Sequence, residues 1–360
     1  MPCFERDWMA ERLLDAIREL PIETANLMEV CGTHTVSIAR SGIKKMLPPQ
    51  VKLLSGPGCP VCVTPTSDID AILDLAMERD VIIATYGDML RVPGSRHGDS
   101  LRRRGTEGAQ VKMVYSPLDA VTLAERNPEK QVVFLGVGFE TTAPGTAIAV
   151  QQAQEKGLAN FTVLPLLKTV KPALEALMAQ SDFAVDGFLC PGHVAVITGA
   201  EHFRFLPENY GRAAVVGGFE PMDILLSVYH LLRQLAESKP TLENEYTRAV
   251  AANGNPLAQQ TVARFFTPCD AVWRGMGKIP QSGLALREGY RQFDAVSRFG
   301  LELGRPEKPS ACECGRVITG KCAPQECPLF GKVCVPENPV GPCMVSGEGA
   351  CAAAYQYQEV

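Results

Sequence analysis

The last 49 residues of the chain hold an unusual density of thiols. Seven of the 13 cysteines lie there, against six in the preceding 311 residues. The seven are Cys312, Cys314, Cys322, Cys327, Cys334, Cys343 and Cys351. Thiolates spaced irregularly among Pro and Gly are typical of loops that wrap an iron-sulfur cluster. A zinc ribbon normally presents two CxxC pairs, and no CxxC occurs in this region, so the spacing favours iron and sulfide over zinc.

A separate thiol pair lies much earlier in the chain. Cys59 and Cys62 form a CxxC motif just past an expected strand and ahead of a helical run from Asp68. A helix N-terminus lowers the pKa of nearby thiols, and such a pair can cycle between dithiol and disulfide. Half of a zinc site has the same pattern, so the motif alone leaves that alternative open.

A third pattern places Cys31 and His34 three residues apart in a Gly-containing turn at the end of another expected strand. The two side chains could ligate one metal, or the imidazole could act as base to the thiol. Packing with local hydrogen bonds is the plainer alternative. Because the carboxyl ends of parallel strands share one crevice, we expect Cys31, Cys59 and Cys62 to face a common cleft.

Other candidates are weaker. Cys190 and His193 could border a crevice, although a buried thiol and a hydrogen-bonded imidazole are the simpler interpretation. Residues 136–142 lack both the complete Gly-x-Gly-x-x-Gly pattern and the Walker Lys, which disfavours nucleotide binding. Cys3 and Cys269 belong to no motif.

These motifs need a scaffold of strands that alternate with helices. The expected strands are 25–30, 51–55, 81–86, 111–115, 132–137, 161–167, 187–190 and 213–216, and the expected helices are 69–79, 118–125, 146–156, 172–179 and 223–237. This alternation predicts an α/β protein with parallel sheets. We expect one α/β domain over 1–137, a second over 138–240, and a small cysteine-rich iron-sulfur domain within 241–360.

The C-terminal region differs in composition from the rest. From Glu307 onward Cys, Pro and Gly dominate, so this part has few apolar side chains to bury. We therefore expect it to need metal or covalent cross-links to hold its shape.

Composition restricts the possible partners and the compartment. A net charge of -5 offers no basic surface for a phosphate backbone, which disfavours nucleic acid. The charged N-terminus lacks the apolar core of a signal peptide, and no uncharged stretch reaches the ~18 residues of a membrane helix. We expect a cytoplasmic protein, in which thiols serve as ligands or redox groups more readily than as structural disulfides.

Four segments together resemble the signatures of a known family. They are 29–35, 55–62, 138–142 and 341–351, and they contain Cys31, the CxxC pair, Gly-Phe-Glu-Thr-Thr and Gly-Pro-Cys-Met-Val-Ser-Gly-Glu-Gly-Ala-Cys. In this order, and over nearly the full length, they are similar to the HypD family of [NiFe]-hydrogenase maturation factors.

The resemblance implies two α/β domains and a small domain with a [4Fe-4S] cluster. Residue by residue, the family pattern places the cluster ligands at Cys312, Cys327, Cys334 and Cys351. It makes Cys314 and Cys343 a redox-active pair beside the cluster, an arrangement similar to that of ferredoxin-thioredoxin reductase. Cys322 lies outside the pattern.

The resemblance also implies an activity: a metal-cofactor assembly factor with redox chemistry, which builds the Fe(CN)2CO group of [NiFe]-hydrogenases. The expected partners are a small HypC-type chaperone, a HypE-type cyanide donor and, indirectly, the hydrogenase large subunit. Cys31 would bind the iron with a chaperone cysteine, His34 would lie nearby, and Cys59 and Cys62 would handle electrons or the incoming ligand. The alternative is a stand-alone iron-sulfur protein-disulfide reductase, in which Cys31 and His34 would be dispensable.

Overall fold

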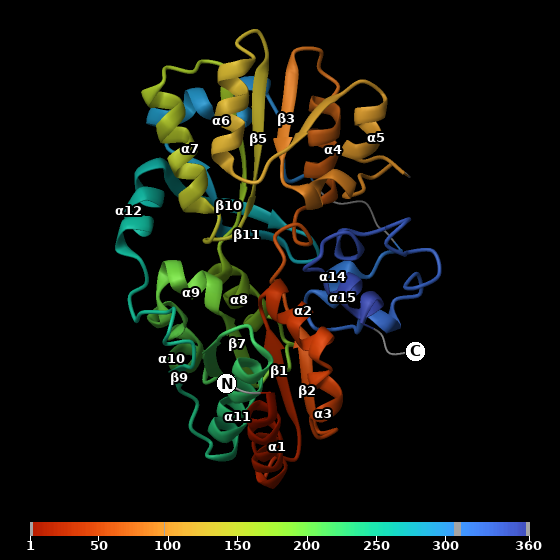
Figure 1. The fold of residues 1–360 in the computed structure, drawn as a ribbon, viewed down its shortest axis with the longest axis vertical. Helices are drawn as coiled ribbons and strands as arrows, with labels where there is room; N and C mark the ends of the chain where they lie inside the picture. Colours follow the sequence, from red (N-terminus) through yellow and green to blue (C-terminus); the bar gives the residue numbers. More distant parts are fainter. Residues whose placement is uncertain (1–2, 97, 306–310, 358–360) are drawn as a thin grey trace.

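The chain folds around two parallel sheets and one antiparallel hairpin (Figure 1). The computed structural model describes residues 3–96, 98–305 and 311–357. A cysteine-rich region at the C-terminal end lies beside the two sheets. The predicted α/β class with parallel sheets and a small cysteine-rich region is confirmed.

The first sheet has five parallel strands in the order β2-β1-β7-β8-β9. These strands are β1 (Ala25–Glu29), β2 (Val51–Ser55), β7 (Gly187–Pro191), β8 (Ala213–Gly217) and β9 (Leu242–Asn244). The second sheet has four parallel strands in the order β4-β3-β5-β6. These are β3 (Val81–Thr85), β4 (Gln110–Met113), β5 (Gln131–Gly138) and β6 (Phe161–Leu167). Eight of these nine strands overlap the expected ones, and β9 was not expected.

The sheets divide the chain differently from the expected contiguous domains 1–137 and 138–240. The chain forms β1 and β2 in the first sheet, crosses to the second sheet for β3 to β6, and returns to the first for β7 to β9. The expected boundary at residue 137 falls inside β5. Local periodicity identifies a strand but not its partner, because the partner is set by packing between segments distant in sequence.

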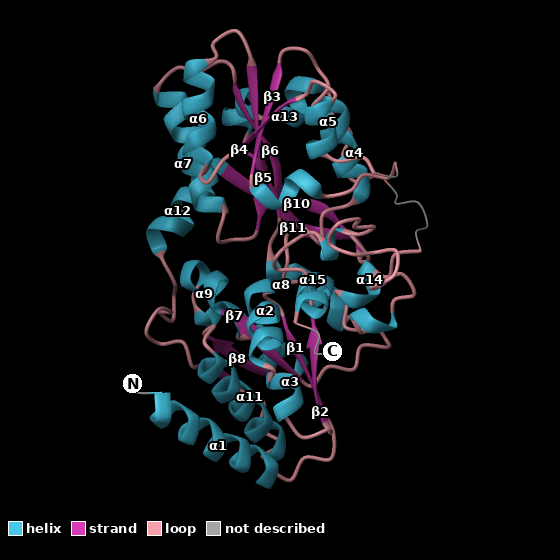
Figure 2. Cartoon of the chain, turned by 45° about the vertical axis from the view of Figure 1, so that its right-hand side comes forward, coloured by secondary structure: helices cyan, strands magenta, loops and turns pink. Residues whose placement is uncertain are grey.

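Helices cover both faces of the two sheets (Figure 2). The main ones are α1 (Cys3–Glu19), α2 (Gly32–Ser41), α3 (Ile43–Met46), α4 (Thr66–Leu75), α5 (Leu101–Thr106), α6 (Pro117–Arg126), α7 (Ala143–Glu155), α8 (Val170–Met178), α9 (Gly192–Thr198), α10 (Phe205–Tyr210), α11 (Pro221–Ala236), α12 (Pro256–Phe265) and α13 (Ala295–Phe299). Local capping marks several starts: Ser116 caps α6 ahead of Pro117, and Asn255 caps α12 ahead of Pro256.

Alternate residues of the central strands enter different cores, as a pleated strand buried on both faces requires. In β1, Leu27 joins the cluster under α1 and α11, whereas Met28 faces the core on the opposite side of the sheet. The core that contains Met28 also includes Val317 and Met344 of the cysteine-rich region. That region therefore buries apolar side chains against the sheets, and metal is not the only support for its position.

Residues 273–283, which are rich in Gly and Pro, belong to a β-hairpin. Strands β10 (Phe266–Trp273) and β11 (Gly277–Leu286) pair antiparallel, and β11 packs beside β6. The cysteine-rich region beyond it contains two short helices, α14 (Cys314–Val317) and α15 (Ala350–Gln356), and α15 packs on α2. Among the described residues, no helix has both the length and the apolar character to span a membrane.

The carboxyl ends of β1 and β2 are joined by a close backbone contact. The Gly32 N–H donates a 3.0 Å hydrogen bond to the Gly58 carbonyl. A Cβ at Gly58 would overlap the backbone of Cys31. Glycine is therefore required sterically where the CxxC loop crosses the Cys31 turn.

We expect Gly58→Ala to destabilise the fold by about 1–3 kcal/mol, because the added methyl group must displace the Cys31 turn. Gly105→Ala is the matched control, since a Cβ there meets nothing within 4 Å. The control should be neutral or slightly stabilising, as Gly105 lies in α5. Urea unfolding midpoints of the two variants provide the measurement, and equal midpoints would contradict the contact.

Candidate metal centre and thiol site

Cys31 lies between β1 and α2, where its backbone is extended and the helix begins at the next residue. Its side chain is 8% exposed. Burial, with a smaller contribution from the negative charge of Glu348, raises the pKa of Cys31 to about 12. The metal-free thiol is therefore protonated, and a metal ion that binds it must displace the proton.

Glu29 supports the Cys31 turn from within the sheet. Its carboxylate accepts a 3.1 Å hydrogen bond from the Cys31 N–H and another from the Thr35 hydroxyl. Burial raises the pKa of Glu29 to about 7. The side chain fixes the backbone that presents the Cys31 sulfur.

His34 is fully buried in the first turn of α2. Its Nε2 lies 2.8 Å from the Gly218 carbonyl oxygen, and its ring stacks on Phe219. A carbonyl can only accept, so Nε2 carries the hydrogen. Burial lowers the pKa of His34 to about 4, so the ring is neutral at pH 7. Its Nδ1 is then a buried acceptor for which the described residues provide no hydrogen-bond donor.

Cys59 and Cys62 form a disulfide, with their Cα atoms 5.2 Å apart. Both are buried, at 5% and 0% exposure. The Cys62 N–H donates to the Cys59 sulfur at 3.2 Å. The expected placement at a helix N-terminus is only approximate: α4 begins at Thr66, after a turn and Pro65. Local turn geometry, not the first turn of the helix, surrounds these sulfurs.

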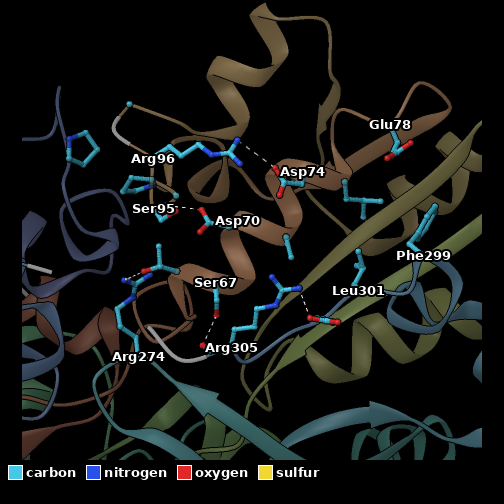
Figure 3. Close-up of a pocket in the computed structure, with 18 of the residues that line it drawn as sticks. Ser67, Asp70, Asp74, Glu78, Ser95, Arg96, Arg274, Phe299, Leu301 and Arg305 are labelled. Carbon is cyan, nitrogen blue, oxygen red and sulfur yellow. Dashed lines mark hydrogen bonds and ion pairs between the residues drawn. The ribbon is translucent and has the colours of Figure 1, made fainter. Parts of the chain in front are cut away.

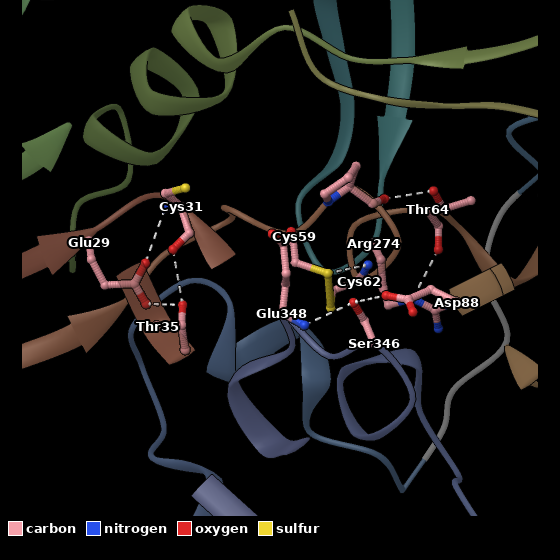
Figure 4. Close-up of a disulfide and its surroundings, with 11 residues drawn as sticks. Glu29, Cys31, Thr35, Cys59, Cys62, Thr64, Asp88, Arg274, Ser346 and Glu348 are labelled. Carbon is pink, nitrogen blue, oxygen red and sulfur yellow. Dashed lines mark hydrogen bonds between the residues drawn. A yellow bond between two sulfur atoms is a disulfide. The ribbon is translucent and has the colours of Figure 1, made fainter. Parts of the chain in front are cut away.

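Figure 4 shows Cys31 and the disulfide on the same side of the loop that contains Ser346 and Glu348. The Glu348 carboxylate accepts a 2.9 Å hydrogen bond from Thr33, next to the Cys31 turn. The Ser346 hydroxyl donates to Asp88, beyond the end of β3, at 2.9 Å. The cysteine-rich region is thus tied to strand ends of both sheets.

Five thiols of the cysteine-rich region lie near one another. Hydrogen bonds join Cys314 to Cys312 and Cys343 to both Cys314 and Cys351. Cys334 lies close enough to Cys312 and Cys314 for their negative charges to contribute to its raised pKa, which is due mainly to burial. The two residues predicted as a redox pair, Cys314 and Cys343, are therefore neighbours.

The protonation of this group is uneven. Hydrogen bonds from Cys314 and Cys343 lower the pKa of Cys351 to about 6. The hydrogen bonds of Cys343 to Cys314 and Cys351, together with burial, raise its own pKa well above the usual value. These hydrogen bonds therefore favour the thiolate form of Cys351.

The surroundings of these sulfurs are chemically compatible with an iron-sulfur cluster. No group of three or more His, Cys, Asp or Glu in the described part of the chain has the geometry to hold one metal ion. The backbone of Gly341 lies directly against the sulfurs of Cys312 and Cys314, where a Cβ would collide with both. The Val340 N–H donates to the Cys334 sulfur at 3.3 Å, the kind of hydrogen bond that tunes iron-sulfur clusters. A set of buried thiols with amide donors fits a [4Fe-4S] cluster chemically.

The remaining predicted ligand, Cys327, is buried and directly follows the short 3-10 turn Pro324–Glu326. It lies near Cys322, whose pKa is raised chiefly by burial and slightly by the charge of Cys327. Cys322 itself donates to the Ala323 carbonyl at 3.2 Å. The structure therefore groups Cys312, Cys334 and Cys351, and leaves the role of Cys327 as a prediction.

The weaker candidates lie at or after the carboxyl ends of β7 and β5, which belong to different sheets. Cys190 is fully buried at the end of β7. His193 stacks on the Phe219 ring that also contacts His34. Glu140 follows β5, and its carboxylate accepts a 2.8 Å hydrogen bond from the Val170 N–H. Burial raises the pKa of Glu140 to about 7.

Several residues that shape the site were not singled out from the sequence. Glu348 and Ser346 lie within the 341–351 motif, so that motif was the available signal. Asp88 and Arg274 have no local signal, because their contacts are made across the fold.

The chain is similar to known proteins over almost its whole length. The family model described as HypD, Hydrogenase formation hypA family, matches residues 8–358. A hydrogenase maturation factor HypD from Rhodobacter capsulatus is 44% identical and covers 99% of this chain and 96% of its own. Proteins of the same name from Azotobacter vinelandii and Escherichia coli K12 are 45% and 44% identical and cover 94% and 92% of this chain, and 90% and 89% of their own. Because the match extends across both sheets and the cysteine-rich region, the chain belongs to the HypD family of hydrogenase maturation factors.

Proposed function

We propose that this protein is the scaffold on which the Fe(CN)2CO group of [NiFe]-hydrogenases is assembled. One observation supports this most directly: the Cys31 turn, the Cys59–Cys62 disulfide and the cysteine-rich region meet at one edge of the first sheet. An anchor for iron, a two-electron thiol store and a candidate cluster site are thereby brought together.

Cys31 has the properties that an iron anchor needs. A soft thiolate suits iron that carries strong-field cyanide and carbonyl ligands. Its burial keeps water from the site, and Glu29 fixes its backbone. The incoming iron, the substrate of this step, would be held jointly with a cysteine of the HypC-type chaperone, and the free Nδ1 of the neutral His34 ring would be available as a hydrogen-bond acceptor beside it.

In this proposal Cys312, Cys327, Cys334 and Cys351 hold a [4Fe-4S] cluster, which when bound would exchange single electrons. Cys314 and Cys343 lie in hydrogen-bond contact beside that group and would pass reducing equivalents onward. Cys59 and Cys62 are already close enough to form a disulfide, so they can store two electrons as a dithiol. The release of cyanide from a sulfur-bound donor requires such electrons.

The partners follow from the same scheme. A HypC-type chaperone would share the iron, a HypE-type protein would deliver cyanide, and the hydrogenase large subunit would receive the finished group through the chaperone. We propose that this takes place in the cytoplasm.

The stand-alone disulfide reductase fits the geometry less well. Such an enzyme must present a sulfur to a protein substrate, but Cys59 and Cys62 are 5% and 0% exposed. That role also gives no reason for the hydrogen bonds that Glu29 makes to the Cys31 turn.

The cluster assignment predicts that protein purified without oxygen contains about four irons and four sulfides per chain. Cys327→Ala or Cys334→Ala should abolish this content and lower the stability of the cysteine-rich region, because a ligand is lost. Cys269→Ala, in β10, is the matched control and should retain the iron. Full iron content in either ligand variant would refute the assignment.

The division of roles predicts different losses in the thiol variants. Cys31→Ala should remove the infrared bands of cyanide and carbonyl from the complex with the chaperone while the C-terminal cluster persists, because the iron has lost its anchor. Cys59→Ser and Cys62→Ser should still bind iron but not convert it to the cyanide-bearing form, since serine cannot undergo thiol-disulfide exchange. Iron analysis and infrared spectra of the three variants, measured together, provide the test. Normal bands in the Cys31 variant would return the reductase alternative to first place.

A further inference from the structure

We infer that Arg274, at the tip of the β10–β11 hairpin, is a positioning residue that holds the CxxC segment against the cysteine-rich region. Its guanidinium also places a positive charge beside the sulfurs of the cysteine-rich region. The inference rests on the proposed iron-sulfur cluster and extends that proposal to a residue outside every recognised motif. Arg274 would then affect both the Cys59–Cys62 pair and the proposed cluster, the two groups that would handle electrons.

Arg274 binds the residues that directly follow the disulfide. Its backbone N–H donates to the Val63 carbonyl at 2.8 Å. Its guanidinium donates to the Thr64 carbonyl at 3.1 Å and to the Thr66 hydroxyl at 2.7 Å. Three hydrogen bonds from one residue thus fix the chain between Cys62 and the start of α4.

The hairpin tip also touches the cysteine-rich region. The backbones of Gly275 and Gly315 lie so close that a Cβ on either would collide with the other. Gly275 has a φ of +74°, which favours glycine sterically. Because Gly315 directly follows Cys314, the tip that carries Arg274 is held next to the cysteine pair.

A cavity of about 1260 Å³ lies beside the hairpin tip, and Figure 3 shows Arg274 among the residues that line it. Its wall includes Arg274 and Gly275 from the hairpin, and Cys312 and Cys314 from the cysteine-rich region. Arg305 lines the same cavity but is 64% exposed and pairs with Glu302. Arg274 is the more buried of these two cations.

The guanidinium of Arg274 lies on the same cavity wall as two of the cysteines, Cys312 and Cys314. The contact between Gly275 and Gly315 holds the Arg274 segment next to Cys314. A cluster that accepts an electron gains one negative charge. A nearby cation therefore favours the reduced form and raises the reduction potential.

Arg274 would assist the reduction of the Cys59–Cys62 disulfide, and an external reductant supplies the electrons for this step. Reduction of the Cys59–Cys62 disulfide breaks one S–S bond, consumes two electrons and two protons, and leaves two thiols. The electrons come from a one-electron donor, dithionite in the experiment, through the cluster.

Two substitutions separate the charge of Arg274 from its contacts. Arg274→Gln removes the charge, whereas Arg274→Lys keeps it but loses the forked geometry that reaches Thr64 and Thr66 together. Arg305→Gln is the matched control, because it removes a cation from the same cavity. All four proteins are prepared as full chains, and iron content and circular dichroism establish that each is folded and loaded.

Anaerobic redox titration of the cluster measures the charge effect. We expect Arg274→Gln to lower the equilibrium constant for one-electron reduction about tenfold, equivalent to about 59 mV, and Arg274→Lys and Arg305→Gln to leave it near wild type. Rapid mixing with dithionite, followed by thiol alkylation, measures disulfide reduction, which should slow about tenfold in both Arg274 variants. Hydrogen exchange of the metal-free chains should show faster exchange over residues 60–66 in both.

The outcomes distinguish two failures. A potential in Arg274→Gln equal to that of wild type and of Arg305→Gln would overturn the inference while the cluster proposal stands. A wild-type protein without a cluster would overturn the proposed function, and unchanged exchange over residues 60–66 would independently refute the positioning role. Should Arg274→Gln fail to load iron, Arg274→Lys with wild-type rates of disulfide reduction and exchange would overturn the inference.

Discussion

The hydrogen bond between Gly32 and Gly58 joins the two turns on which the site depends. It forms because β1 and β2 are parallel neighbours, so the chain leaves both strands at the same edge of the sheet. The approach is so close that only glycine fits at position 58. The distance between the Cys31 turn and the CxxC loop is consequently fixed by backbone packing and not by flexible side chains. The cysteines on these two separate segments are thereby held at one edge of the first sheet.

The cysteine-rich region completes the site by covering it. Its loop reaches Thr33 through Glu348 and Asp88 through Ser346, so one short segment contacts strand ends of both sheets. Apolar residues such as Val317 and Met344 join the main core and hold the region in place. Cys31 and the Cys59–Cys62 disulfide are buried beside this region. Under the proposed function, the same packing would exclude water from iron held by Cys31.

The chain path explains why the parts of the site are so far apart in sequence. The first sheet is built from β1 and β2 and then, after the whole second sheet, from β7 to β9. His34 on α2 consequently meets Gly218 and Phe219, which follow β8. The hairpin then returns between the sheets, and Arg274 at its tip contacts the segment after the CxxC pair. Each crossing adds a side chain that local sequence does not connect with the motifs.

The sequence by itself determined the elements and the chemistry of the motifs. Alternating apolar runs located eight of the nine parallel strands, and the thiol spacing singled out Cys31, the CxxC pair and the C-terminal cysteines as candidate reactive groups. These features are local, because strand periodicity and residue type are read within a few positions. The tertiary structure decided which strands share a sheet, which thiols touch, and that Glu348 and Arg274 complete the site. Those contacts join residues more than 200 positions apart, and they exist only because packing of the two sheets and the cysteine-rich region brings their backbones together.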